Sequence, residues 1–269
     1  MNYIELFGLS TSGKTHFKNK MFRDLKKKKK NILDQKIIII KFFLKNKNIK
    51  FKNYLKLQLL LLFYSNFSIL IKSFFKRKRT VKKSRNKIYF SSSKKKWYHL
   101  ILDSIGLETQ YLEILRILEK QFKVKDKNLL YKIILKDISK LKQNSLFKNK
   151  LKKWFLENVI LIEILKKEKD IYCVVDEGIL QKIFIMFGLI KNNRSFMKRI
   201  IKYIDNYGNI YLVQSNLKEI QRRSLERQKK SSEFIYQSYQ QIVKEYNKLK
   251  IFEKLIKNKI IYKKIFNNR

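Results

Sequence analysis

Hydrophobic residues follow two different periods along this chain, which predicts a protein built from both strands and helices. Short runs of β-branched and aromatic residues indicate buried strands at Tyr3–Phe7, Ile171–Val175 and Ile210–Val213. A further apolar run, Ile37–Ile40, is predicted to be the second strand along the chain. Strands of this kind, separated by helical segments, favour an α/β fold with a parallel sheet and helices on both of its faces.

Apolar residues spaced three and four apart predict amphipathic helices between and after these strands. One such face holds Leu107, Tyr111, Ile114, Leu115, Leu118 and Phe122, and another holds Trp154, Phe155, Val159, Ile162, Ile164 and Leu165. A third face, which we expect Gly208 to end, holds Phe196, Met197, Ile200, Ile201 and Ile204, and a core helix follows with Ile235, Tyr239, Ile242, Tyr246 and Leu249. We interpret 1–269 as a single domain with a large helical insertion at 45–150 that covers an acceptor site, because no linker or internal repeat divides the chain.

The composition excludes several classes of protein. Of the 269 residues, 45% are hydrophobic, which is enough to bury a core and argues against general disorder. One cysteine, Cys173, excludes a disulfide framework and a CxxC metal site, and we expect it to be a small buried residue of its strand. The two histidines, His16 and His99, lie far apart, so a zinc centre is not expected.

The formal net charge of +44 suggests a polyanionic partner, but the residue choice weakens that interpretation. Only 11 of the 65 basic residues are arginine, and the chain contains neither proline nor alanine. This bias is what an AT-rich genome produces, and lysine is the poorer residue for bidentate phosphate recognition. We therefore attribute most of the charge to codon bias. Binding of nucleic acid or an anionic membrane surface stays an alternative.

No segment predicts a membrane span or an export signal. The most apolar stretch, Leu57–Ile71, is shorter than the roughly 20 residues of a spanning helix and is interrupted by polar residues. The first residues lack a basic region and a cleavage site. With a single cysteine, the cytoplasm is the expected compartment, and a homodimer is left open.

Residues 8–15, Gly-Leu-Ser-Thr-Ser-Gly-Lys-Thr, match the phosphate-binding pattern G-x-x-x-x-G-K-[ST] in full. The loop follows a predicted strand and precedes a helix whose apolar face holds Phe17, Phe22 and Leu25, as the motif requires. Its backbone N–H groups and the helix N-terminus would bind phosphate, Lys14 would reach the β- and γ-phosphates, and the Thr15 hydroxyl would hold Mg²⁺. The predicted nucleotide-binding residues are Gly8, Ser10, Thr11, Ser12, Gly13, Lys14, Thr15 and His16.

Two acidic residues follow the strand Ile171–Val175. A carboxylate at this strand end belongs beside the phosphate loop, so Asp176 is predicted to organise Mg²⁺ together with Thr15. The next residue, Glu177, is the candidate base that accepts a proton from a substrate hydroxyl.

Arginines cluster on a helix after the strand Ile210–Val213. Asn216 and Glu219 have the spacing of a capping box, which begins a helix carrying Arg222, Arg223 and Arg227. Arginine in a lysine-dominated chain indicates a selected function, since a planar guanidinium suits the transferring phosphoryl group. We interpret 216–233 as a lid-like helix in which Arg223 and Arg227 are catalytic, as are Lys14 and Glu177.

With these three landmarks in order, the chain resembles the P-loop nucleoside and nucleotide kinases, nearest the thymidylate and deoxynucleoside kinases. The resemblance covers roughly residues 1–25 and 165–250. It implies a five-stranded parallel sheet that binds ATP, and a lid after the fourth strand whose arginines reach the phosphates. It also implies ATP and Mg²⁺ as cofactors and a small-molecule phosphoryl acceptor such as a nucleoside or nucleotide.

The same segments differ from that family in ways that leave the acceptor open. Asp176-Glu177-Gly178 stands where those kinases have Asp-Arg-aromatic or Glu-Arg, and about 160 residues separate the phosphate loop from the acidic strand. The alternatives are a P-loop NTPase with a regulatory or mechanical role and a basic binding protein that keeps a vestigial loop.

Overall fold

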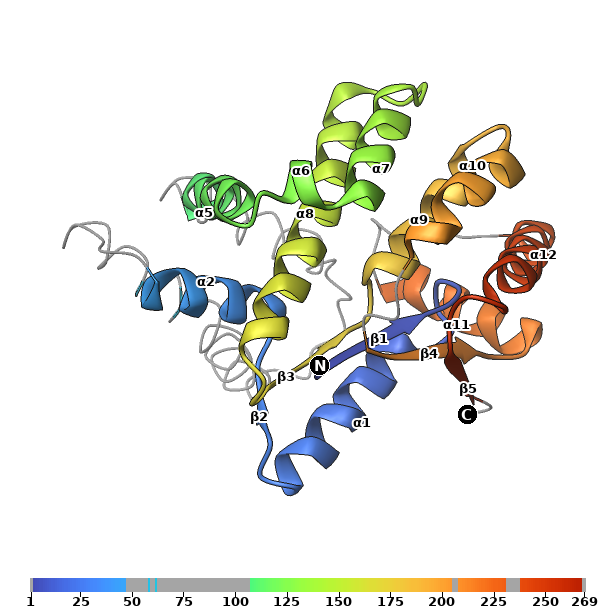
Figure 1. The fold of residues 1–269 in the computed structure, drawn as a ribbon. Helices are drawn as coiled ribbons and strands as arrows, with labels where there is room; N and C mark the ends of the chain where they lie inside the picture. Colours follow the sequence, from blue (N-terminus) through green and yellow to red (C-terminus); the bar gives the residue numbers. More distant parts are fainter. Residues whose placement is uncertain are drawn as a thin grey trace, which may run out of the picture.

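A computed structural model describes residues 2–46, 58, 61, 107–204, 208–230 and 238–267 of the chain. Within these ranges, five strands form one sheet in the order β2-β3-β1-β4-β5, and all its neighbouring strands are parallel (Figure 1). The strands are β1 Tyr3–Phe7, β2 Asn31–Ile32, β3 Ile171–Val175, β4 Asn209–Gln214 and β5 Tyr262–Phe266. The predicted α/β class with a parallel sheet is therefore confirmed.

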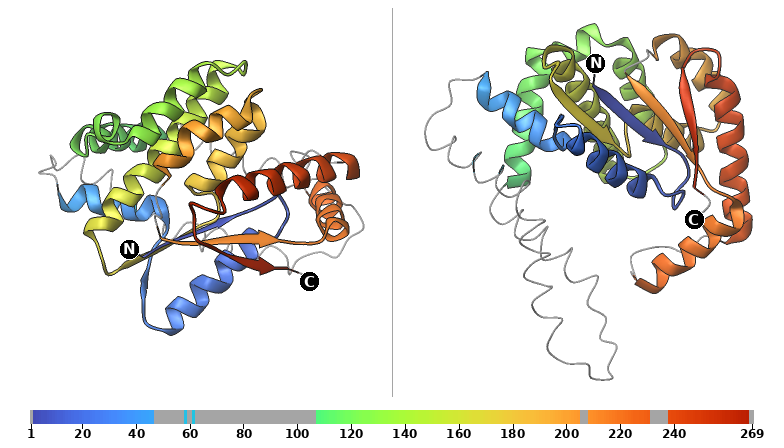
Figure 2. Two further views of the ribbon diagram at one scale, coloured as in Figure 1. Left: turned by 45° about the vertical axis from the view of Figure 1, so that its right-hand side comes forward. Right: turned by 90° about the horizontal axis from the view of Figure 1, so that it is seen from below.

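Alternating side chains of the strands enter two separate apolar clusters, one on each face of the sheet. Tyr3 and Phe7 of β1 belong to the large cluster, whereas Leu6 belongs to the small one. Helix α1 (Lys14–Lys27) covers the small cluster through Phe17, Met21, Phe22 and Leu25. Helices α8 (Ser145–Lys167) and α9 (Ile179–Leu189) lie on the opposite face (Figures 1 and 2). Both faces are thus covered, as a parallel sheet requires.

The remaining helices extend the large cluster away from the sheet. Their bounds are α2 Gln35–Lys45, α5 Leu107–Gln121, α6 Val124–Lys127, α7 Leu129–Ser139, α10 Asn193–Ile200, α11 Leu217–Lys230 and α12 Tyr239–Ile256, with a 3₁₀ turn η2 at Ile201–Tyr203. The apolar faces predicted for α5 and α8 are confirmed among the described side chains, since Tyr111 and Phe155 are buried in the core. The face predicted for α12 is confirmed only in part: Ile242 and Leu249 are buried, but Tyr239 is 45% exposed, and Ile235 lies outside the described residues. None of these described helices combines the length and the hydrophobicity that a bilayer crossing needs.

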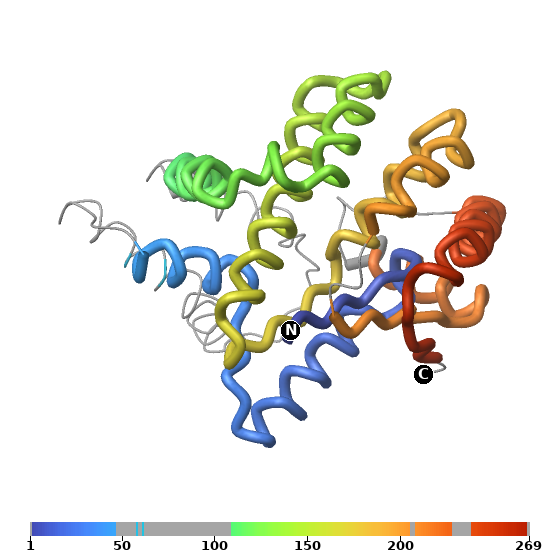
Figure 3. The backbone as a smooth tube through the Cα atoms, in the orientation of Figure 1, coloured from blue at the N-terminus to red at the C-terminus, as the bar shows by residue number. Residues whose placement is uncertain are grey.

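The order of the strands opens a crevice at one end of the sheet. After β1 the chain turns toward β2 on one side, and after β4 it turns toward β5 on the other (Figure 3). Loops that diverge from neighbouring parallel strands leave room for a ligand outside the carboxyl ends of those strands. The 8–15 loop follows β1, and α11 follows β4, so both predicted phosphate-binding segments border this crevice.

The prediction that Ile37–Ile40 is a strand is wrong, because these residues lie within α2. Asp34 begins that helix by accepting a hydrogen bond from the N–H of Lys36. Ile38, Ile39 and Ile40 are buried against helical neighbours. In a short run where every residue is apolar, the hydrophobic pattern cannot distinguish a strand from a helix. The second strand is instead the two-residue β2, which ends just before this helix.

Other predictions differ from the structure or lie outside its described residues. The helix predicted at 196–204 is α10 followed by η2, and it ends at Tyr203. Gly208 does not end it as predicted, because Gly208 directly precedes β4, with φ 150°. Apart from residues 58 and 61, residues 47–106 of the predicted insertion lie outside the described residues, and these include nearly all of Leu57–Ile71. Residues 231–233 of the predicted lid also lie outside them. Residues 107–150 are largely helical, as predicted.

Candidate active site

The 8–15 loop connects β1 to α1 through a backbone that needs glycine at two positions. Gly8 has φ 143° and Gly13 has φ 100°, and both values fall where side chains other than hydrogen are disfavoured. A Cβ on Gly8 would collide with the carbonyl oxygen of Val213, and one on Gly13 would collide with the side chain of Asn267. These glycines therefore let the loop lie against the ends of β4 and β5 while α1 begins at Lys14.

Lys14 folds back over its own loop. Its Nζ donates hydrogen bonds to the carbonyl oxygens of Gly8 at 2.9 Å and Leu9 at 2.7 Å. Removal from water lowers the pKa of Lys14 to about 8, even though the nearby charges of Glu177 and Asp176 act to raise it. A cation with so little compensation is well suited to accept an anionic ligand.

Thr15 and Asp176, predicted to share a magnesium ion, lie in direct contact. The Thr15 hydroxyl donates to Oδ2 of Asp176 at 3.1 Å, although 161 positions separate the two residues. Lys18, one turn further along α1, pairs with Oδ1 of the same carboxylate at 3.3 Å. Partial burial raises the pKa of Asp176, but Lys18 and the Thr15 hydrogen bond outweigh it, so the net pKa lies below the ordinary value. Asp176 is therefore ionised at neutral pH.

A hydroxyl and one carboxylate fit the way Mg²⁺ is held beside phosphates. Mg²⁺ keeps several waters and uses one or two carboxylates together with phosphate oxygens, so it needs no all-protein cage. Within the described part of the chain, no group of three His, Cys, Asp or Glu side chains could hold a metal ion. Thr15 and Asp176 are the residues that would hold Mg²⁺ here.

Glu177, the predicted base, lies at the same strand end and is anchored by a lysine that sequence reasoning missed. The Glu177 carboxylate is exposed and pairs with Nζ of Lys182, a side chain only 2% exposed. That ammonium also lies 4.0 Å from the ring centre of Trp154 on α8. A buried lysine needs such partners. Lys182 thus holds the Glu177 carboxylate at the strand end and links it to Trp154 of α8.

A third carboxylate, Glu5, supports the site from the interior of β1. It is fully buried on β1 and accepts hydrogen bonds from the N–H of Gln181 at 2.9 Å and the hydroxyl of Tyr3 at 3.2 Å. The Gln181 side chain in turn accepts from the N–H of Gly8 at 2.9 Å. Glu5 therefore caps the N-terminus of α9 by accepting from the Gln181 N–H. The Gln181 side chain in turn connects α9 to Gly8, the first glycine of the loop. Burial raises the pKa of Glu5 to about 7, although these hydrogen bonds act to lower it.

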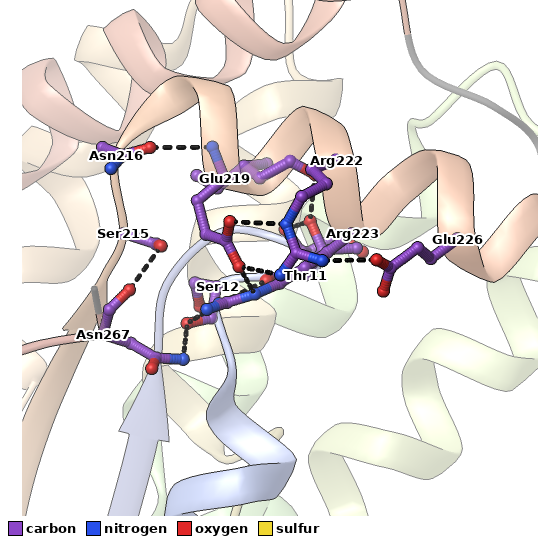
Figure 4. Close-up of polar contacts among 11 residues, drawn as sticks. Thr11, Ser12, Ser215, Asn216, Glu219, Arg222, Arg223, Glu226 and Asn267 are labelled. Carbon is purple, nitrogen blue, oxygen red and sulfur yellow. Dashed lines mark hydrogen bonds and ion pairs between the residues drawn. The ribbon is translucent and has the colours of Figure 1, made fainter. Parts of the chain in front are cut away.

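The arginines of α11 separate into two groups (Figure 4). Arg223 reaches the loop, where its Nη1 donates to the carbonyl oxygens of Thr11 and Ser12, both at 3.3 Å. Glu219 holds it from the same helix, with Nε donating at 2.6 Å. Arg222 pairs with Glu219 and Glu226 on the exposed side of α11. Arg223 therefore contacts the loop directly, and the catalytic roles of Arg223 and Arg227 stay predictions.

The predicted start of the lid-like helix is confirmed in part. Asn216 accepts a hydrogen bond from the N–H of Glu219 at 2.7 Å, as a helix cap should. The Glu219 carboxylate is turned toward Arg222 and Arg223. The cap therefore begins α11 directly after β4, and the carboxylate orients an arginine toward the loop (Figure 4).

Two clefts flank the loop. The first cleft, of about 340 Å³, is lined mainly by Gly13, Thr15, His16, Arg223, Arg227 and Asn267. The second cleft, of about 300 Å³, begins at Lys14, Asp176 and Glu177 and continues between α9 and α12. Arg227 lines both clefts, as do Thr11, Gly13 and Thr15. The two clefts therefore adjoin at the loop, beside the predicted catalytic residues.

The other predicted loop residues have different surroundings. Ser10 is exposed in the second cleft and His16 is exposed in the first. Thr11 is nearly buried, and its hydroxyl donates to the carbonyl oxygen of Ile220 on α11 at 3.2 Å. Ser12 is buried and lines neither cleft, and its carbonyl oxygen accepts from Asn267 at 3.1 Å. Ser12 therefore ties the loop to the end of β5.

Comparison with known proteins gives no family assignment. A scan against protein-family models, a search of curated proteins and a search of solved structures each returned no match.

Proposed function

We propose that the protein transfers the γ-phosphoryl group of ATP to a small acceptor, with Mg²⁺. The observation that carries this proposal is the contact between Thr15 and Asp176, at 3.1 Å, beside Lys14. Two segments predicted independently from sequence, a phosphate loop and an acidic strand end, meet at the point where phosphoryl transfer needs them. A kinase needs two ligands at one loop, and the two clefts provide the space.

The donor nucleotide is assigned to the first cleft. Its arginines, Arg223 and Arg227, can contact phosphate from α11, and Glu226 and Asn267 line the same cleft. The N-terminus of α1 points its free N–H groups at the same place, which favours an anion. Mg²⁺ at Thr15 and Asp176 would supply charge neutralisation for the β- and γ-phosphates.

The transfer itself uses few protein groups. An acceptor hydroxyl in the second cleft loses its proton to the Glu177 carboxylate. Its oxygen forms a bond to the γ-phosphorus while the bond from that phosphorus to the β-phosphate oxygen breaks, and ADP leaves. Lys14 and Arg227 line this cleft and can offset the charge on the transferring group. Catalysis is thus mainly positioning and electrostatic stabilisation.

An acceptor screen tests this function. Purified protein with ATP and Mg²⁺ is assayed for ADP formation with each member of a panel of small alcohols and phosphate esters, and without any acceptor. The proposal expects ADP formation that depends on both Mg²⁺ and an acceptor. ADP formation that no acceptor stimulates would instead support a non-kinase P-loop NTPase. Absence of ADP formation, combined with steeply salt-dependent binding to polyanions, would support the basic binding protein.

A further inference from the structure

The second cleft differs chemically from the surface of this strongly basic chain. Basic residues outnumber acidic ones by 65 to 21 over the sequence. The charged residues that line the second cleft are nevertheless mostly acidic: Asp176, Glu177 and Glu245 against Lys14 and Arg227. Both cations lie at the loop end, where the proposed function uses them for the phosphates of ATP. Within the described part of the chain, the rest of the cleft therefore offers an acceptor no cation of its own.

Beyond the loop, the second cleft is an apolar slot. Phe184 and Ile185 of α9 line it, as do Ile220 of α11 and Ile242 of α12. Phe184, Ile220 and Ile242 are almost fully buried, so they form packed walls. Helices α9 and α12 are in contact along this region (Figures 1 and 2). The slot is one part of the second cleft, whose whole volume of about 300 Å³ fits one small organic molecule with its reacting group at the loop.

Glu245 adds a hydrogen-bond acceptor from α12. Its carboxylate pairs with Lys248 on the same helix, with 2.6 Å between the atoms, and it is more than one-third exposed. Lys248 does not line the cleft, whereas Glu245 does. A carboxylate has more acceptor capacity than one ammonium fills. Glu245 can therefore accept a hydrogen bond from an N–H or O–H group of a ligand in the slot.

Lys182 does not supply the missing cation. It is 2% exposed, pairs with Glu177 and lies against Trp154. It is not among the residues that line the cleft. Among the described lining residues the cations are Lys14 and Arg227, which the proposed function uses for ATP. A phosphate on the acceptor would therefore face Glu177 and Glu245 without a further cation from these residues, and burying such a charge is costly.

We propose that the second cleft selects an acceptor alcohol that carries no phosphate. The hydroxyl lies at Glu177, the apolar body lies between α9 and α12, and a hydrogen-bond donor contacts Glu245. This inference rests on the proposed kinase function and names its substrate class. Glu245 is then a specificity-determining residue, since it contacts the acceptor but not the phosphates.

Matched pairs of probes, which differ only in one phosphate, test this assignment. Common deoxyribonucleosides and their 5′-monophosphates are titrated by calorimetry into the full-length protein saturated with Mg²⁺ and a non-hydrolysable ATP analogue. At least one nucleoside should bind about tenfold or more tightly than its monophosphate. Glu245→Gln should weaken binding of that nucleoside by about tenfold, because a hydrogen bond to an ionised carboxylate is replaced by a weaker one to a neutral amide.

Glu163→Gln is the matched control, since Glu163 and Lys166 form the same kind of pair on α8, at 2.7 Å, away from this cleft. It should bind the nucleoside as the parent does. Three results would each overturn the assignment while leaving the kinase function standing. They are tighter binding of the monophosphates, no binding of any nucleoside, and equal nucleoside affinity of Glu245→Gln and the parent. The ATP analogue is titrated first, and its failure to bind would reject the proposed function itself, and this assignment with it.

Discussion

Replacement of Glu5 by glutamine should make the protein more stable at neutral pH and remove a large part of its pH dependence. Glu5 is fully buried on β1, where the N–H of Gln181 and the hydroxyl of Tyr3 donate to its two oxygens. A glutamine has nearly the same shape and can still accept the hydrogen bond from Gln181. It carries no charge, so the substitution removes the cost of burying an ionised carboxylate and little else.

The size of the effect follows from the shift in pKa. The pKa of Glu5 rises from 4.5 to about 7 on folding, chiefly because burial disfavours the charged form. A carboxyl with a raised pKa contributes stability that is fully present below its unfolded pKa and is lost as the pH rises through its folded pKa. Between about pH 5 and about pH 8 the parent should therefore lose about 2 to 3 kcal/mol of unfolding free energy relative to Glu5→Gln.

Urea denaturation of the parent and Glu5→Gln across this pH range measures the difference. Taking the difference cancels groups that titrate equally in both proteins, including Asp176 and Lys14. The gap in unfolding free energy should open in favour of Glu5→Gln as the pH rises. A gap that stays constant with pH, or one that opens in favour of the parent, would refute the account of Glu5 as a buried carboxyl with a raised pKa.

Three further predictions concern the site and its support. Gly178→Ala should destabilise the fold by about 3 kcal/mol, because its Cβ would collide with Tyr3 and Glu5. Gly188→Ala in α9, whose Cβ would make only an ordinary contact with Nζ of Lys248 at 3.9 Å, should be neutral or stabilise the fold by up to about 1 kcal/mol. Equal melting temperatures for the two variants would contradict this. Asp176→Asn should raise the Mg²⁺ concentration needed for half-maximal turnover, whereas Glu177→Gln should lower turnover and leave nucleotide binding unchanged. Identical kinetics of the two variants would contradict the separate roles of Asp176 in holding Mg²⁺ and Glu177 as base. Arg223→Ala and Arg227→Ala should lower turnover by a factor of about 10³ but ATP affinity much less, and Arg227→Lys should not fully restore the rate. The control Arg222→Ala, which removes two ion pairs, with Glu219 and Glu226, should behave as the parent. Normal turnover in the Arg223 and Arg227 variants would reject the lid.

The sequence predicted the central strands because they are buried on both faces and rich in β-branched residues. β1, β3 and β4 fit that description, and they are the strands that carry the site. The other two strands gave no such signal. β2 has only two residues, and β5 is a largely exposed edge strand with two consecutive lysines. Conversely, Ile37–Ile40 were predicted to be a strand but are helical, because four consecutive isoleucines show neither the period of a strand nor that of a helix.

The candidate site was predictable where one segment carried the whole signal. The loop motif and the acids after β3 are local patterns, and parallel strands bring their ends to one edge of the sheet. Gln181, Glu5 and Asn267 could not be identified in this way, because their contacts join segments far apart in the chain. Lys182 did leave a signal, since a lysine inside the otherwise apolar helix α9 needs buried partners.

Calorimetric titration of Mg²⁺-ATP into the parent, Lys14→Ala and Lys20→Ala tests the central claim most directly. Lys14 lies in the loop between the two clefts, whereas Lys20 is an exposed lysine two turns further along α1. The parent and Lys20→Ala should bind with the same affinity, and Lys14→Ala should bind at least about tenfold more weakly, because a charged contact to the β- and γ-phosphates is lost. Equal affinity of the parent and Lys14→Ala, or no binding by the parent, would contradict the assignment of this loop to a nucleotide.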